Sequence, residues 1–157
     1  NLFFKIYIKW FFMISLIQRV SEAEVIINEK QIAKINNGIL VLIGIEVGDN
    51  DFKINRFVNK LLNFRIFNDN SGRMNLNVLQ IQGEVLLVPQ FTLLADNNSG
   101  NRPSFSQSPN TSFSKDIFNK IILEATKSPI RIASGEFGKE MKVNLSNEGP
   151  ATFWVKV

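Results

Sequence analysis

The apolar residues of this chain fall mainly into short runs, many of them β-branched and separated by polar or glycine-containing turns. Short runs of this kind are typical of β-strands, and a continuous apolar run indicates a strand buried on both faces. Residues 38–47 form such a continuous run, and residues 28–30 are typical of a hairpin turn. The predicted strands cover residues 13–20, 23–28, 31–35, 38–47, 83–94, 130–134, 140–146 and 151–157.

Two segments have helical spacing instead. Between residues 49 and 62 apolar side chains recur with a helical period, and Asp49 or Asn50 is placed to cap the first turn. The second helical segment covers residues 112–127 and ends before Pro129. Two separated helices among many strands, without regular alternation of strand and helix, predict an α+β fold. We expect a curled, barrel-like antiparallel or mixed sheet with the two main helices packed on it.

The first twelve residues differ from the rest of the chain. They are apolar but contain Lys5 and Lys9, and they are too short to span a bilayer. They lack the cleavage site of a secretory signal, and an interfacial helix is an alternative interpretation. We expect residues 1–12 to be upstream sequence outside the fold and residues 13–157 to form a single domain.

Composition limits the available chemistry. The chain has no cysteine and no histidine, which excludes disulfides and thiolate nucleophiles and removes the commonest general base and metal ligand. We therefore expect no metal site and no cofactor, and the missing cysteines fit a cytoplasmic location. The formal net charge is +4, and without Lys5 and Lys9 there are 16 basic and 14 acidic residues. Charge alone therefore does not indicate a nucleic-acid partner.

Recognised phosphate-binding and metal-binding spacings are missing from the sequence. Gly38, Gly44 and Gly48 match neither the dinucleotide-binding nor the P-loop pattern. Asp49 and Asp51 have no third ligand at metal-like spacing, so we interpret them as a helix-start pair favoured by the helix dipole.

One proline interrupts a predicted strand, and another lies between two predicted strands. Pro89 stands in L-L-V-P-Q-F-T-L, and because proline cannot donate to a ladder, this strand must stop, bulge or lie at an edge. One interpretation is a ladder that ends here and leaves backbone N–H groups for a ligand, and the other is an edge strand. Pro150 follows Gly149 in N-E-G-P-A-T-F-W, which is either a tight turn between strands or a rigid device that fixes the direction of its carbonyl oxygens.

Several segments together resemble one known family: M-I-S-L-I-Q-R-V, L-L-N-F-R-I-F-N-D-N-S-G-R-M-N-L-N, V-P-Q-F-T-L-L-A-D, G-N-R-P-S-F and N-E-G-P-A-T-F-W. Their order and spacing, from Met13 to Val157, resemble those of the D-aminoacyl-tRNA deacylases. The resemblance implies a homodimer that hydrolyses the ester joining a D-amino acid, or glycine, to the 3′ end of tRNA. It implies no cofactor, no membrane partner and no DNA partner.

The resemblance also implies roles for particular residues. Gln90, Phe91 and Thr92 would line the catalytic pocket. The bond between Gly149 and Pro150 would be cis, and this dipeptide would enter the partner subunit's pocket and exclude L-amino acids.

Further positions take supporting roles through the same resemblance. Arg19 would hold the dipeptide in orientation, and Phe137 and Met141 would lie near the terminal adenosine.

Two positions depart from the family's pattern. Pro89 replaces the usual Ser, and Ala151 replaces the usual Val. A related branch with relaxed chirality control also has Pro at the first of these positions, but it has Ala in place of Phe91. Phe91 therefore favours the strict form, while Pro89 leaves the stringency of chiral selection open.

The mechanism follows partly from what the chain lacks. Without histidine or cysteine, Thr92 has no obvious activating base, which argues against a threonine nucleophile. We expect oriented backbone N–H groups to stabilise the oxyanion and the neighbouring 2′-hydroxyl of the tRNA to assist hydrolysis. A gate of rigid carbonyls excludes an L side chain by steric clash but cannot exclude glycine, which has no side chain.

Three alternatives compete with this hypothesis. A non-catalytic RNA-binding module would carry base-stacking aromatics on an exposed sheet face and a larger positive charge. A metal-dependent hydrolase would need ligands other than histidine and cysteine. A relaxed or inactive family member would remain a tRNA-binding dimer, with Pro89 as the mark of its divergence.

Overall fold

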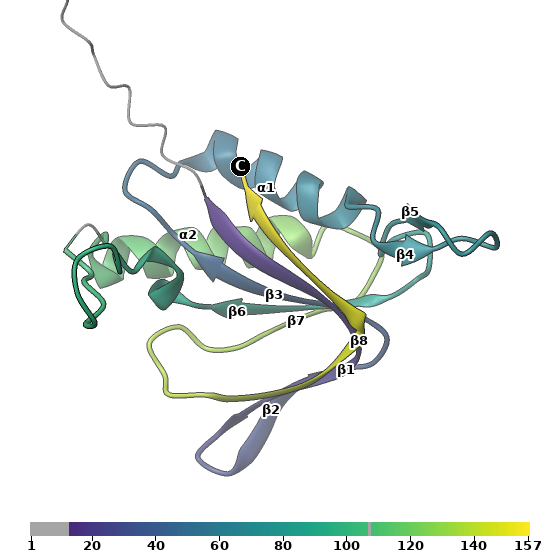
Figure 1. The fold of residues 1–157 in the computed structure, drawn as a ribbon, viewed down its shortest axis with the longest axis horizontal. Helices are drawn as coiled ribbons and strands as arrows, with labels where there is room; N and C mark the ends of the chain where they lie inside the picture. Colours follow the sequence, from purple (N-terminus) through teal and green to yellow (C-terminus); the bar gives the residue numbers. More distant parts are fainter. Residues whose placement is uncertain (1–12, 107) are drawn as a thin grey trace, which may run out of the picture.

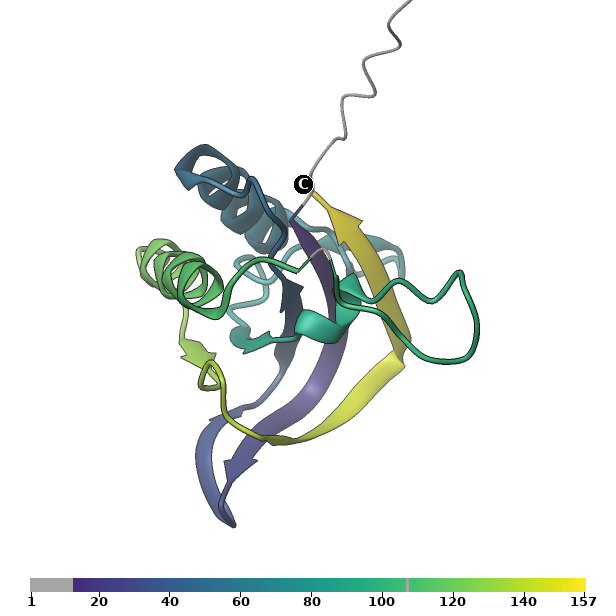
Figure 2. The same cartoon turned by 90° about the vertical axis from the view of Figure 1, so that its left-hand side faces the viewer.

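The computed structural model describes residues 13–106 and 108–157, in which two α-helices pack on one side of a curled sheet (Figures 1 and 2). The prediction about residues 1–12 lies outside the described residues. The six-stranded sheet contains β1 (Ile14–Ile27), β2 (Lys30–Ile35), β3 (Gly38–Gly44), β6 (Glu84–Pro89), β7 (Ile132–Ser134) and β8 (Lys142–Lys156). The remaining elements are α1 (Asp51–Asn63), β4 (Phe67–Asn68), β5 (Met74–Leu76), the 3-10 helix η1 (Phe91–Leu94) and α2 (Thr111–Ala125).

The sheet is mixed, and it runs in the order β2-β1-β3-β6-β7 with β8 on the other edge of β1. The pairs β3–β6 and β6–β7 are parallel, whereas β1 pairs antiparallel with each of its three neighbours. The first half of β1 pairs with β3, and its second half pairs with β2. The strand therefore bends from one partner to the other, and the nearly closed mixed sheet with two helices confirms the predicted α+β class.

Two boundaries differ from the sequence-based prediction. The expected strands 13–20 and 23–28 are one strand, β1, and the expected strands 140–146 and 151–157 are one strand, β8. The reason is the long pairing between β1 and β8, which runs from Ile14–Lys156 to Ile26–Lys142. Backbone hydrogen bonds across this pair keep polar and irregular stretches within the strands.

The buried residues form two cores on opposite faces of the sheet. One core lies beneath the helices and includes Phe57 of α1 and Phe118 of α2. The other lies inside the curl of the sheet and includes Val25 and Leu86. β3 contributes to both cores because its alternate residues face opposite sides, which explains its continuous apolar sequence.

The two helices begin at asparagine caps. The Asn50 side chain accepts a hydrogen bond from the Lys53 backbone N–H at 3.1 Å, and the Asn110 side chain accepts one from Phe113 at 2.8 Å. α1 buries its predicted apolar face, except that Phe52 is 70% exposed beside the guanidinium of Arg56. The helices therefore cover the sheet with the faces that their sequence period predicts.

Candidate active site

The first part of the candidate site is the end of β6. Pro89 is the last residue of this strand and lies in register with Ile43 of β3. The Gln90 N–H donates one further bond to the Ile43 carbonyl at 2.8 Å, and the ladder then stops. β6 lies between β3 and β7, so the edge-strand interpretation of Pro89 is wrong. The proline is tolerated because β7 pairs with β6 only as far as Leu87, and the ring lies beyond that point.

Beyond Pro89 the chain forms η1 rather than the predicted continuation of the strand. The first hydrogen bond of this turn runs from the Leu93 N–H to the Gln90 carbonyl at 3.2 Å. The N–H groups of Phe91 and Thr92 precede that bond, so neither has a partner within the turn. The Gln90 side-chain amide donates to the Thr92 hydroxyl.

Gly44 of β3 sets the position of η1. A Cβ added at this glycine would lie 3.2 Å from the Cβ of Leu93 and 3.2 Å from Cδ2 of Leu94. These contacts are tighter than ordinary van der Waals contact, so a larger residue would push the turn away from the sheet. The backbone of η1 is therefore placed by close packing on the adjacent strand.

A pocket of about 680 Å³ opens beside this strand end. Among its lining residues are Pro89, Gln90 and Phe91, together with Phe137 and Met141 from the segment between β7 and β8. The structure thus brings together residues that are separated by about fifty positions in the sequence. Such a concave, largely apolar site with a few polar groups is typical of a small-molecule or substrate-end pocket.

Phe105 and Ser108 are among the pocket-lining residues that were not predicted from the sequence. Phe105 lies with its ring centroid 5.1 Å from that of Phe91, and Phe91 remains 58% exposed. The buried hydroxyl oxygen of Ser108 has no hydrogen-bond partner in the part of the chain that the structure describes. The segment G-N-R-P-S-F, already noted in the family resemblance, was the available signal for Phe105.

The second part of the candidate site is a bulge in β8. Gln18 pairs with Thr152, and Val20 pairs with Asn147, so Arg19 alone stands opposite residues 148–151. The extra residues project from the strand, and Gly149 and Pro150 are exposed. The bond between Gly149 and Pro150 is cis, as the resemblance implied, and the tight-turn interpretation is wrong because β8 continues on both sides.

Arg19 holds the base of this bulge. Its Nε donates to the Glu148 carbonyl at 3.0 Å, and its Nη1 donates to the Ile66 carbonyl at 2.8 Å. Gly149 has a φ of 126°, and a Cβ added to it would lie 2.6 Å from Nη2 of Arg19. The backbone conformation therefore favours glycine at this position, and any larger residue would also have to displace the guanidinium of Arg19.

The residues of the bulge do not line the pocket. Arg19, Gly149 and Pro150 are not among the residues that line the pocket, and neither is Thr92. The predicted site residues therefore fall into two groups, one at the strand end and one at the bulge.

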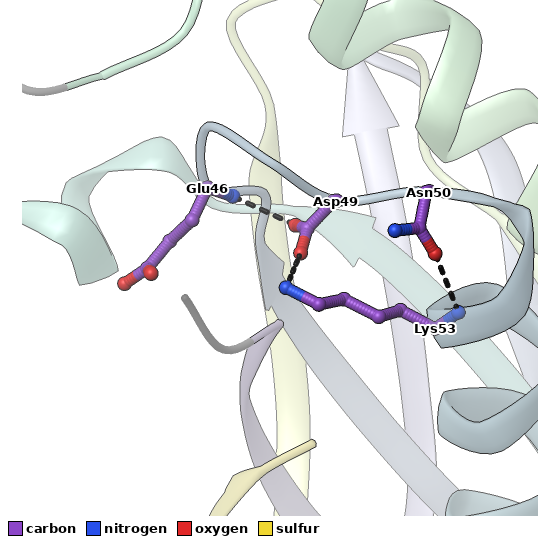
Figure 3. A network of polar contacts seen from close by, with 4 residues as sticks. All are labelled: Glu46, Asp49, Asn50 and Lys53. Carbon is purple, nitrogen blue, oxygen red and sulfur yellow. Dashed lines mark hydrogen bonds and ion pairs between the residues drawn. The ribbon is translucent and has the colours of Figure 1, made fainter. Parts of the chain in front are cut away.

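A buried carboxylate, that of Asp49, lies in the loop between β3 and α1 (Figure 3). Asp49 accepts a bond from the Glu46 N–H at 2.8 Å and pairs with Lys53 Nζ at 3.4 Å. Burial raises the pKa of Asp49, although the Glu46 N–H and the Lys53 ammonium oppose this rise. These contacts stabilise the loop between β3 and α1. Asp51 lies apart from them, in the first turn of α1.

Metal ligands do not cluster in the described part of this protein. Within residues 13–106 and 108–157, no three acidic, histidine or cysteine side chains are grouped so that they would hold a metal ion. In the same residues, neither helix has the length and apolar character needed to cross a membrane.

The comparison with known families is decisive. Residues 16–156 match the family model described as D-Tyr-tRNA(Tyr) deacylase. The chain belongs to this family. The matched residues include both parts of the candidate site, from Arg19 on β1 to Pro150 on β8.

Curated members of the deacylase family are similar over almost their whole length. A D-aminoacyl-tRNA deacylase of Pseudoalteromonas atlantica is 46% identical over 145 residues, which is 92% of this chain and all of that protein. One of Haemophilus influenzae is 47% identical over 146 residues, with the same coverage of both chains.

Solved structures show the same deacylase fold. A protein named c-Myc DNA unwinding element binding protein aligns with a TM-score of 0.86 and 36% identity, over 91% of this chain and 97% of its own. A probable eukaryotic D-amino acid tRNA deacylase aligns with a TM-score of 0.80 over 94% of this chain and all of its own. Because the second is only 16% identical, it supports the fold alone.

Proposed function

We propose that this protein hydrolyses the ester bond of D-aminoacyl-tRNA and of glycyl-tRNA, releasing free tRNA in the cytoplasm. The observation that carries the proposal is the family match across residues 16–156, combined with a pocket lined by five of the residues selected from the sequence. Relatives covered along almost their whole length are named for this activity. The fold alone would not carry the proposal, because one fold serves many functions.

The turn η1, beside the pocket, supplies the means to stabilise an oxyanion. In ester hydrolysis, water adds to the carbonyl carbon, the carbonyl oxygen gains negative charge, and the 3′ oxygen of the tRNA leaves with a proton. The N–H groups of Phe91 and Thr92, which precede the first hydrogen bond of η1, are the donors we assign to that oxygen. Held in a turn packed on Gly44, they need no reorganisation during the reaction.

Thr92 is assigned a supporting role rather than that of nucleophile. Its hydroxyl accepts a hydrogen bond from the Gln90 amide, which is not a base and cannot remove the hydroxyl proton. We assign the assistance to the tRNA's own 2′-hydroxyl, next to the ester. Phe137 and Met141 supply apolar surface for the terminal adenosine, and Pro89 lines the same pocket.

Chiral selection is assigned to Gly149 and Pro150 of a second subunit. This dipeptide is exposed and does not line the pocket of its own chain, which fits its entry into the pocket of a partner. We therefore propose a homodimer in which the carbonyl oxygens of the dipeptide occupy the space that an L side chain needs.

The test is a deacylation assay with matched D-tyrosyl-, L-tyrosyl- and glycyl-tRNA, using protein that starts at Met13. We expect hydrolysis of the D and glycyl substrates and little hydrolysis of the L substrate. Comparable rates on D and L substrates would identify a relaxed form and would link Pro89 to the loss of stringency. Resistance of glycyl-tRNA would contradict selection by rejection alone.

Two arms of the assay address the remaining alternatives. Binding of tRNA without hydrolysis of any substrate would identify an RNA-binding or inactive member of the family. Loss of hydrolysis on addition of EDTA, restored by a divalent cation, would identify a metal-dependent hydrolase. We expect unchanged rates with EDTA, since the described residues form no three-ligand cluster.

A further inference from the structure

The bulge that carries Gly149 and Pro150 is closed at its base by a single side-chain amide. The Asn147 Oδ1 accepts a hydrogen bond from the Ala151 N–H at 3.0 Å. Asn147 and Ala151 lie on either side of the three projecting residues, so this bond joins the two ends of the bulge. Ala151 is buried and marks the point at which the chain returns to the strand.

The same amide also connects the bulge to the sheet. The Asn147 Nδ2 donates to the Thr152 hydroxyl at 2.8 Å, and the Gln18 side chain of β1 donates to that hydroxyl at 3.2 Å. A continuous series of side-chain hydrogen bonds therefore runs from β1 through Thr152 and Asn147 to the backbone of Ala151. It approaches the bulge at its C-terminal end, whereas Arg19 holds the N-terminal end through the Glu148 carbonyl.

We infer that Asn147, supported by Thr152 and Gln18, is a positioning residue that sets the direction of Gly149 and Pro150 and thereby the ability to reject L-aminoacyl-tRNA. The inference rests on the proposed function, because it assigns this amide to the proposed gate. Arg19 fixes one end of the bulge, but a projecting segment held at one end can still pivot. A second attachment at the other end removes that freedom.

The effect is expected in selectivity rather than in stability. The hydrogen bonds from Asn147 and Gln18 to Thr152 are exposed, and exposed hydrogen bonds contribute little to the free energy of unfolding. A steric gate is different, because displacement of a positioned group by about 1 Å changes rates by about a hundredfold. A looser gate admits the L side chain, and the D substrate, which already fits, gains nothing.

The experiment compares Asn147→Ala with a matched control, Asn144→Ala. Asn144 is another asparagine on β8, but it lies outside the bulge. Its amide donates a hydrogen bond to Glu24 Oε1 of β1 at 2.9 Å. Initial rates are measured on D-tyrosyl-tRNA and L-tyrosyl-tRNA, with thermal melting and sedimentation of each variant. We expect Asn147→Ala to raise the L rate at least about tenfold with the D rate nearly unchanged, and Asn144→Ala to match wild type.

Two further variants separate positioning from general damage. Asn147→Asp keeps an oxygen that accepts from Ala151 and a second oxygen that accepts from the Thr152 hydroxyl, so it should restore low activity on the L substrate. Thr152→Val keeps the shape of the side chain but removes the link to Gln18, and we expect an intermediate rise in the L rate.

Several results would overturn the inference. One is an Asn147→Ala protein that rejects the L substrate as well as wild type does. Another is a rise in L activity that accompanies dissociation of the dimer, since it would assign Asn147 to the interface instead. A wild-type protein that fails to discriminate between D and L substrates would instead overturn the proposed gate, which keeps the two failures distinguishable.

Discussion

Both prolines that interrupt strands in this protein lie at the candidate site, but their surroundings differ. Pro89 ends a strand between two neighbours, lines a pocket and is followed by a turn that packs on Gly44. Pro150 stands in a bulge that is exposed and held at its base by hydrogen bonds. Packing positions the first region, and directional polar contacts position the second.

The difference indicates how the proposed function is divided. A group that must stabilise charge in the transition state needs a rigid, enclosed support from its own chain. A group that must enter another subunit has to project, so it cannot be packed on both sides by its own chain. Each of the following predictions changes one region and leaves the other intact.

The largest effect is expected at the packed region. Gly44→Val adds atoms where a Cβ alone would lie 3.2 Å from Leu93 and Leu94 side chains, and it should displace η1 with its N–H groups. We expect the rate on D-tyrosyl-tRNA to fall about a hundredfold. Valine suits a strand, so melting should change much less than activity. Full activity in this variant would show that the position of η1 does not matter for catalysis.

The next effect is expected at the bulge. Arg19→Lys keeps the charge but loses the planar guanidinium, which donates hydrogen bonds to the carbonyls of both Glu148 and Ile66. We expect hydrolysis of L-tyrosyl-tRNA to rise about tenfold while the D rate stays within about threefold. The matched control is Arg131→Lys, which alters a guanidinium that bonds Lys34 and Glu84 away from the bulge. Equal effects of the two changes would refute a specific role for Arg19.

A smaller effect is expected from Thr92→Ala. If the hydroxyl only accepts the hydrogen bond from the Gln90 amide and the backbone N–H stabilises the oxyanion, the rate on D-tyrosyl-tRNA should fall less than about tenfold. The measurement is a single-turnover rate with Thr92→Ser as the control that retains a hydroxyl. Abolished hydrolysis in a folded alanine variant, with normal rates in the serine variant, would instead identify Thr92 as the nucleophile.

The smallest effect concerns how the stability of the protein depends on pH through the carboxyl group of Asp49. Burial raises the pKa of Asp49 in the folded protein, so the unfolded chain loses this proton first as the pH rises. The contribution of this carboxyl to stability is therefore fully present in acid and falls as the pH rises above about 4. The amide introduced by Asp49→Asn cannot titrate, so we expect the stability of wild type relative to this variant to decrease as the pH rises above about 4. Urea unfolding across this range measures it, and a difference that increases with pH would refute the shift.

Much of the fold followed from local patterns. The helical period of residues 49–62, with Asp49 or Asn50 at its start, predicted α1 and its cap, because a helix needs one apolar face and a side-chain acceptor at its start. The continuous run at 38–47 predicted a buried strand, and β3 does face a core on each side. These features depend on residues close together in sequence.

The rest of the fold depends on contacts between residues that are far apart in the sequence. The letters F-T-L-L are typical of a strand, yet they form η1, because the ladder ends at Pro89 and Gly44 accommodates a close turn. The Gly149–Pro150 pair is typical of a turn, yet β8 continues because it pairs with β1 on both sides of the bulge. No local pattern indicated that the side chain of Asn147 would close that bulge.

The pairing of Ile14 with Lys156 has a further consequence for synthesis on the ribosome. β8, which pairs along one edge of β1, is made after all the other described strands. Until then that edge offers unpaired backbone groups to other chains, which is a known route to aggregation during translation. Contacts of such long sequence separation also slow folding, so a nascent chain completes this sheet, and with it the bulge opposite Arg19, only after β8 has left the exit tunnel.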